Sequence, residues 1–157
     1  NIDAPNNIRK AVRALRREFD ALKCSSVYES EAIGFVGANF LNLVAIIETT
    51  ADLSSISSFL KLLEDRFGRN REQPRFSART LDVDILFYGD EKTKSDEIEL
   101  PKEEITQYAF VLQPLAELLP DRIHGFTGLT YADLWDEFDQ SNQQLWKVDF
   151  DWRDTFS

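Results

Sequence analysis

The segment "RTLDVDILFYGD", residues 79–90, places Asp82 and Asp84 two positions apart in a run of strand-forming residues. Side chains alternate between the two faces of a strand, so both carboxylates are predicted on one face, with Leu81 and Val83 on the other. Two neighbouring carboxylates repel each other unless a cation lies between them. Mg²⁺ commonly takes one or two carboxylates and completes its shell with water and substrate phosphates. The pair is therefore a candidate magnesium site.

Arginines cluster directly before this pair. They are Arg66, Arg69, Arg71, Arg75 and Arg79. Residues 1–79 hold 12 Lys/Arg against 10 Asp/Glu, whereas residues 80–157 hold 6 against 18. An arginine-rich segment that leads into two carboxylates suits a polyphosphate with a divalent cation. The alternative is the solvated face of an edge strand, with Arg79 pairing with one carboxylate, and the spacing alone leaves both interpretations open.

Hydrophobic periodicity predicts the elements that must position these residues. Helices are predicted over residues 6–23, 52–68, 109–119 and 130–140. Strands are predicted over residues 23–30, 40–50, 79–90, 96–100 and 145–152. Asp52 and Thr130 are the predicted helix caps, Gly68 the predicted end of the second helix, and Pro114 lies inside the third. This order predicts an α+β sandwich with a mainly antiparallel central sheet flanked by helices.

Length and composition limit the classes of protein that the chain can belong to. Its 157 residues, 43% of them hydrophobic, fit one domain over 1–157 with a substantial core. The net charge of −10 argues against a nucleic-acid partner. Cys24 alone allows no disulfide, and the chain lacks both a signal-peptide pattern and a membrane-length apolar run. We therefore expect a cytoplasmic protein with no membrane partner.

Four segments carry a family resemblance. They are "FSARTLDVDILFYGD", "VYESEAIGFVGANFLNLVAIIET", "LLEDRFGR" and "LPKEEITQYAFVLQPLAEL". Together they resemble the hydroxymethyldihydropterin pyrophosphokinases, whose signature is Arg, two residues, Asp, an aliphatic residue and Asp. The resemblance covers nearly the whole chain. It implies a ferredoxin-like three-layer sandwich whose first strand is missing from this chain, which begins at Asn1.

The resemblance also implies roles for individual residues. Asp82 and Asp84 would hold two Mg²⁺ ions that bridge the phosphates of ATP. The catalytic set would be Arg69, Arg71, Arg79, Asp82 and Asp84. The pterin would contact Ser30, Ile33, Gly34, Phe40, Asn42 and Phe110. ATP would contact Glu64, Arg69, Arg79, Ile85 and Lys102. The loop 69–78 would close over the reactants.

Several of these residues have a simpler interpretation. Phe40 and Phe110 are two of 12 phenylalanines and could be core residues, and Glu64 could be a surface helix residue. Asn42 inside an apolar strand is harder to explain this way, because a buried amide needs partners. His124 is predicted in a surface turn with no catalytic role. Cys24 is predicted as a small buried hydrophobe.

The chain departs from the family pattern mainly on the nucleotide side. Lys102 replaces a usual His, and Tyr108 replaces an expected Arg. Glu103 and Glu104 add negative charge next to Lys102. Phe76 stands where Trp is common, and "SEA" over residues 30–32 replaces a usual Thr-Pro pair. The metal and pterin halves keep the pattern, whereas the ATP half is altered.

The leading prediction is an enzyme of folate biosynthesis. It would transfer pyrophosphate from ATP to the hydroxymethyl group of 6-hydroxymethyl-7,8-dihydropterin, in the presence of Mg²⁺, and release AMP. One alternative is a non-catalytic or weakly active relative that binds a pterin or a nucleotide. Transfer to a different acceptor and an interaction domain without a ligand are the others. The expected partners are small-molecule substrates, and the oligomeric state is left open.

Overall fold

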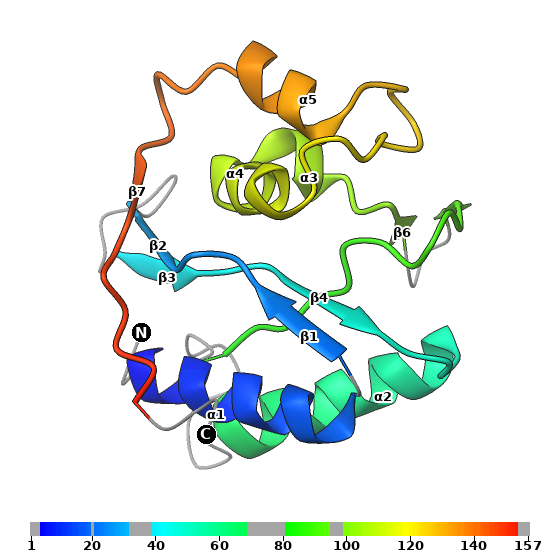
Figure 1. The fold of residues 1–157 in the computed structure, drawn as a ribbon, viewed down its shortest axis with the longest axis vertical. Helices are drawn as coiled ribbons and strands as arrows, with labels where there is room; N and C mark the ends of the chain where they lie inside the picture. Colours follow the sequence, from blue (N-terminus) through cyan, green and yellow to red (C-terminus); the bar gives the residue numbers. More distant parts are fainter. Residues whose placement is uncertain (1–3, 20, 32–38, 69–80, 95–98, 154–157) are drawn as a thin grey trace. The chain divides into compact units, whose positions relative to one another are not determined.

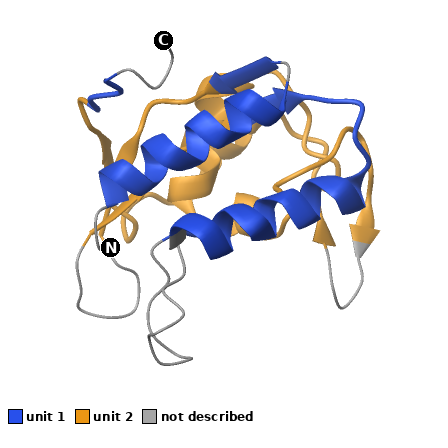
Figure 2. Ribbon diagram, turned by 90° about the horizontal axis from the view of Figure 1, so that it is seen from below, with its two compact units in different colours: residues 1–23, 46–84, 150–157 blue, residues 24–45, 85–149 orange. Residues whose placement is uncertain are grey.

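The computed structural model describes residues 4–19, 21–31, 39–68, 81–94 and 99–153 (Figure 1). The chain divides into two compact units (Figure 2). Unit 1 comprises Asn1–Lys23, Ile46–Asp84 and Phe150–Ser157, and unit 2 comprises Cys24–Ala45 and Ile85–Asp149. The single domain over residues 1–157 stays a prediction.

Unit 1 begins with helix α1, Ala4–Glu18, which buries Ile8, Val12 and Leu15 along one side. The predicted helix over residues 6–23 was too long at its end. Residues Ala21–Cys24 instead form strand β1, which pairs with β4, Ala45–Glu48, mainly within unit 1. Pairing between strands overrides the local helical pattern here, because tertiary contacts outweigh intrinsic propensity.

Helix α2, Leu53–Leu63, starts as predicted. The Asp52 carboxylate accepts a hydrogen bond from the backbone N–H of Ser55 at 2.8 Å, which caps the helix. Hydrogen bonds from Ser55 also lower the pKa of Asp52. The chain then continues through a single turn of π-helix, η1, Glu64–Gly68. This turn ends at Gly68, the predicted end of the helical segment.

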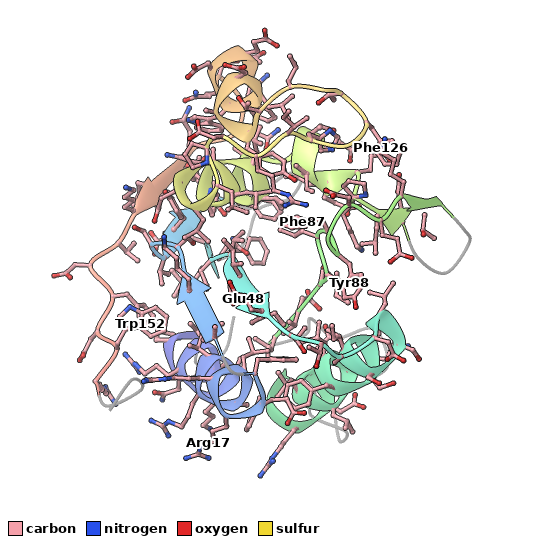
Figure 3. All side chains as sticks on the ribbon, turned by 45° about the vertical axis from the view of Figure 1, so that its right-hand side comes forward. Arg17, Glu48, Phe87, Tyr88, Phe126 and Trp152 are labelled. Atoms are coloured by element: carbon pink, nitrogen blue, oxygen red, sulfur yellow. The ribbon has the colours of Figure 1, made fainter. Side chains whose placement is uncertain are left out.

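Aromatic contacts complete the packing of unit 1. The Phe19 and Phe59 rings meet edge to face, with centroids 5.6 Å apart. Near the other end of α1, the Arg9 guanidinium lies 5.1 Å from the Phe150 ring centroid and donates to the Asp151 carbonyl at 2.7 Å. Phe150 also contacts Trp152, which is labelled in Figure 3. Arg9 therefore joins the C-terminal segment to α1.

Unit 2 contains a three-stranded antiparallel sheet in the order β3-β2-β7. The strands are β3, Phe40–Asn42, β2, Tyr28–Ser30, and β7, Leu145–Lys147. Tyr28 lies opposite Asn42 and Lys147, and Ser30 lies opposite Phe40 and Leu145. A separate two-stranded ladder joins β5, Thr93–Lys94, to β6, Glu99–Leu100.

Three helices build the core of unit 2 (Figure 1). They are α3, Glu104–Gln107, α4, Ala109–Leu118, and α5, Tyr131–Glu137. The Thr130 hydroxyl caps α5 by accepting from Asp133 N at 3.1 Å, as predicted. Their apolar sides enclose a cluster of Val44, Ile105, Leu112, Leu115 and Tyr131. Leu86 and Phe87 pack against this cluster, and Phe87 is labelled in Figure 3.

Two predictions about single side chains were wrong. His124 does precede a turn, but its side chain is only 4% exposed, because it packs on Tyr131 and its Nδ1 accepts from Thr127 N at 3.2 Å. Burial lowers the pKa of His124. Cys24 is half-buried rather than fully buried, at the end of β1. Burial still raises the pKa of its thiol to about 11.

These elements confirm an α+β fold with small antiparallel sheets flanked by helices. The finer arrangement, a ferredoxin-like three-layer sandwich with a missing first strand, stays a prediction. Of the helices in the described ranges, none has the length and apolar character needed to cross a bilayer.

Candidate functional site

The aspartate pair keeps the predicted alternation. Asp82 and Asp84 are both exposed, whereas Leu81, Val83 and Ile85 are half-buried. The two carboxylates therefore share the solvent side of an extended segment in unit 1, as their spacing predicts. The segment itself is not the core strand that we expected, because residues 81–88 join no ladder with the other residues that the structure describes.

A contact of Glu64 partly explains why this segment does not form the expected core strand. Its carboxylate Oε2 accepts a hydrogen bond from the backbone N–H of Val83 at 3.0 Å. A side chain thus takes the donor that a neighbouring strand would otherwise bind. Glu64 is half-buried in the π-helical turn η1, and Val83 is the residue between the two aspartates. The resemblance assigned Glu64 to ATP, which stays a prediction, and in the structure the Glu64 carboxylate accepts from the backbone of the aspartate segment.

The donors around the pair fit a magnesium ion that is completed by substrate. Asp82 and Asp84 supply carboxylate oxygens, which are the hard ligands that Mg²⁺ prefers. In the described part of the chain, no three His, Cys, Asp or Glu side chains gather into a metal cluster. Two exposed carboxylates suit an ion whose remaining positions are filled by phosphate oxygens and water, and they do not form a complete cage of protein ligands.

The residues that the resemblance assigned to the pterin come together in unit 2. Ser30 on β2 lies opposite Phe40 on β3, and Asn42 is two residues further along β3. All three side chains therefore share one face of the sheet. The Asn42 amide Nδ2 donates to the Ser30 hydroxyl at 3.4 Å, so the amide has the partner that its burial requires. Ser30 is buried, whereas Phe40 and Asn42 are half-buried.

This face of the sheet points toward helix α4. Tyr28 shares it with Ser30, and the Tyr28 hydroxyl donates to Glu117 Oε1 at 2.5 Å. Glu117 Oε2 also accepts from the backbone N–H of Ser26 at 2.8 Å. Burial by itself raises the pKa of Glu117, but the hydrogen bonds from Tyr28 and Ser26 and the charge of Lys147 outweigh it and lower that pKa.

A second contact fixes the opposite end of α4. Gln143 Oε1 accepts from the backbone N–H of Ala109, the first residue of the helix, at 2.8 Å. The chain runs from Gln143 along β7 to Lys147, whose ammonium lies 3.8 Å from Glu117 Oε1. Contacts near both ends of α4 thus link this helix to residues 143–147, and Leu145, which pairs with Ser30, lies between the two contacting residues in sequence.

Phe110 lies at the end of α4 that Gln143 contacts. The Phe110 ring is half-buried and stacks on Tyr108, with centroids 5.2 Å apart and an interplanar angle of 18°. Ser30, Phe40 and Asn42 therefore form one face of the sheet with a hydroxyl, an amide and one aromatic ring, and this face points toward the helix that carries Phe110. Such a face suits a flat heteroaromatic ligand with polar groups at its rim.

The nucleotide side is only partly described. Lys102 is half-buried, and its Nζ lies 3.8 Å from Glu104 Oε2. A phosphate would therefore compete with the Glu104 carboxylate for the Lys102 ammonium group. The Lys102 backbone N–H donates to the Leu86 carbonyl at 2.8 Å, and Ile85 is half-buried. The predicted site residues Ile33, Gly34, Arg69, Arg71 and Arg79 lie outside the described residues.

Sequence patterns did not identify Glu117 or Gln143. Glu117 looks like any acidic residue near a helix end, and Gln143 lies in the polar run "QSNQQ" without a motif. Both residues matter because of contacts with residues that are distant in sequence. Glu117 contacts Tyr28, 89 positions away, and Gln143 contacts Ala109, 34 positions away. Only an alignment of relatives or a structure could provide a signal for such pairs.

Comparison with known proteins finds matches over most of the chain. The model of the family described as 7,8-dihydro-6-hydroxymethylpterin-pyrophosphokinase matches residues 1–120. A 2-amino-4-hydroxy-6-hydroxymethyldihydropteridine pyrophosphokinase of Bacillus subtilis is 30% identical over 148 residues, which cover 92% of this chain and 84% of that protein. The protein of the same name from Synechocystis is 30% identical over 136 residues, covering 85% and 69%.

A longer relative matches as well. The folate synthesis bifunctional protein of Chlamydia caviae is 35% identical over 130 residues. The match covers 78% of this chain but only 29% of that protein. All the sequence segments that carried the resemblance end before residue 120, inside the range that the family model matches.

Proposed function

Because the chain belongs to the 7,8-dihydro-6-hydroxymethylpterin-pyrophosphokinase family, as the resemblance of its motifs predicted, we propose that it is a pyrophosphokinase of folate biosynthesis. It transfers pyrophosphate from ATP to the hydroxymethyl group of 6-hydroxymethyl-7,8-dihydropterin. The products are AMP and the pterin diphosphate. Membership of a family of enzymes supports this activity over the alternative of a non-catalytic relative.

The observation that carries the proposal is the shared face in unit 2. Ser30, Phe40 and Asn42 lie on one side of the β2–β3 pair, toward the helix that carries Phe110. Phe40 and Phe110 would stack on the pterin ring, and the Asn42 amide would bond to its polar edge. An apolar slot with few polar groups is the usual site for such a ligand. Backbone groups of residues 30–34 would complete it.

Asp82 and Asp84 would hold two Mg²⁺ ions, together with the phosphates of ATP. Both carboxylates are exposed, and the hydrogen bond from Val83 to Glu64 holds the backbone between them. Bound Mg²⁺ supplies positive charge that offsets the charge of the phosphates during transfer. The Val83–Glu64 hydrogen bond restrains the backbone between the two carboxylates before substrate arrives, which would reduce the entropy lost on binding.

The reaction needs alignment more than covalent participation by the protein. The hydroxyl oxygen of the substrate attacks the β-phosphorus of ATP, and the bond from that phosphorus to the oxygen it shares with the α-phosphorus breaks. AMP leaves with this oxygen, and the hydroxyl proton is released. Aromatic stacking orients the hydroxyl group, while Lys102 and the arginines Arg69, Arg71 and Arg79 would bind phosphate oxygens.

The nucleotide product tests the proposal. The protein is incubated with ATP and Mg²⁺, with and without hydroxymethyldihydropterin, and the nucleotides are separated by chromatography. We expect AMP only when the pterin is present. ADP in its place would mean transfer of a single phosphoryl group, and the absence of turnover with pterin bound would favour the non-catalytic alternative.

A further inference from the structure

Helix α4 begins without a cap of its own. Tyr108 occupies the N-cap position, and its side chain makes no capping hydrogen bond. The first N–H groups of a helix need partners from outside, because they have none within the helix. Gln143 supplies one, since its Oε1 accepts from the backbone N–H of Ala109 at 2.8 Å. A residue 34 positions along the chain thus caps this helix.

The same side chain also bonds to the preceding helix. Gln143 Nε2 donates to the carbonyl of Gln107, the last residue of α3, at 3.0 Å. One amide group therefore bridges the junction at which α3 ends and α4 begins. Tyr108 lies between the two bonded backbone groups, and Phe110 follows directly after them.

The segment that carries Gln143 also contacts the strand that carries Ser30. The Gln144 carbonyl accepts from the backbone N–H of Glu31 at 3.4 Å, and Leu145 lies opposite Ser30 in the sheet. Residues 143–145 therefore join the start of the Phe110 helix to the C-terminal end of β2. This segment lies beyond the residues 1–120 that the family model matches.

We propose that Gln143 is a positioning residue for the pterin site, which sets the orientation of Phe110 relative to Ser30 through its two backbone hydrogen bonds. The inference rests on the proposed function, because it takes Phe110 as the residue that stacks on the pterin. Gln143 acts on pterin binding and leaves ATP binding and the transfer step unchanged. Its effect is therefore separable from a general loss of fold.

Three variants test this role. Gln143→Met keeps the length of the side chain and removes both hydrogen bonds. Gln143→Glu keeps an acceptor for the Ala109 N–H but loses the donor to the Gln107 carbonyl. Gln144→Met is the matched control, because the Gln144 side chain makes only a 3.5 Å bond within its own turn. The KM for the pterin, the KM for ATP and kcat are measured for each, with the midpoint of thermal unfolding.

We expect Gln143→Met to raise the KM for the pterin about tenfold, and Gln143→Glu to raise it about threefold, with kcat and the KM for ATP within about twofold of wild type. The control variant should match wild type. If Gln143→Met does not fold, the smaller rise with Gln143→Glu remains the test. An unchanged KM for the pterin, or parallel losses in all three constants, would overturn the proposal.

Binding of the pterin alone separates this inference from the proposed function. Calorimetry gives the Kd of wild type and of each variant without ATP. Wild-type protein that binds the pterin but releases no AMP would contradict the proposed function, while the order of Kd values would still test Gln143. Equal Kd values in wild type and both Gln143 variants would contradict the inference alone.

Discussion

Asp82 and Asp84 show how much of the site a short sequence pattern predicts. Their two-residue spacing predicted that both carboxylates lie on one side, and both are exposed between half-buried neighbours. This alternation is a local property of extended backbone. The hydrogen bond from Val83 to Glu64 spans 19 positions and depends on how the chain returns past η1, so the pattern could not predict it.

Removing either carboxylate charge should abolish transfer without unfolding the protein. We expect Asp82→Asn and Asp84→Asn each to lower kcat at least about a hundredfold, because a magnesium ligand is lost. The midpoint of thermal unfolding should change little, since both side chains are exposed. Asp136→Asn, an exposed position in α5, is the control in the same AMP assay. Near-wild-type rates for both aspartate variants would disprove the metal role.

Cys24 offers a test of burial at a single residue. Burial raises the pKa of its thiol from 9.0 to about 11, so the thiolate fraction at neutral pH should be about a hundredfold smaller than for an ordinary cysteine. We expect slow reaction with a disulfide reagent at pH 7.5 and a rate that keeps rising with pH above 9. Denatured protein is the control. A native rate that levels off by pH 9 would contradict this environment for the thiol.

Elements were predicted well where their ends carry local signals. Asp52, Gly68 and Thr130 mark helix ends as predicted, because capping depends on a few neighbouring residues. Strands were predicted less well. The expected strand over residues 40–50 is split into β3 and β4, and β1 takes residues expected in a helix. Strand pairing depends on partners that are distant in sequence, which a single chain does not reveal.

The contact between α4 and β2 should make stability depend on pH. The folded protein holds the pKa of Glu117 below its usual 4.5. The carboxylate's contribution to the free energy of unfolding is therefore fully present above pH 4.5, and it is lost as the pH falls through the lower pKa of the folded state. We expect Glu117→Gln to lower the free energy of unfolding by about 1–2 kcal/mol at pH 7 and by less at pH 3. Urea titrations at both pH values measure this difference.

The control for this experiment is Glu137→Gln, which changes an exposed glutamate at the end of α5. It should alter the free energy of unfolding by less than about 0.5 kcal/mol at either pH. A cost of Glu117→Gln that is equal at pH 7 and pH 3 would contradict the charged hydrogen bonds to Tyr28 and Ser26.

At the scale of the whole molecule, the sequence allowed the family to be predicted because its motifs are contiguous. The four matching segments all fall within residues 1–120, and the family model matches this range. The residues that support the proposed pterin face are not contiguous. Gln143 lies beyond the matched range, and Glu117 contacts β2 across 89 positions. Motifs therefore predict the chemistry, while supporting contacts require the folded chain.

Uneven charge is the other property of the whole chain that bears on function. Lys and Arg slightly outnumber Asp and Glu over residues 1–79, and most of the net charge of −10 comes from residues 80–157. The excess of cations precedes the aspartate pair in sequence. This distribution suits an anionic nucleotide that binds through arginines and a metal, while the acidic remainder disfavours longer polyanions such as nucleic acid.

The most direct test of pyrophosphate transfer follows the β-phosphorus of ATP. The wild-type protein is given Mg²⁺, hydroxymethyldihydropterin and ATP that carries radioactive phosphorus at the β position, and the pterin and nucleotides are separated. We predict that the label moves to the pterin and that unlabelled AMP is released. Label that stays on the nucleotide as ADP, or as unreacted ATP while the pterin is bound, would contradict pyrophosphate transfer.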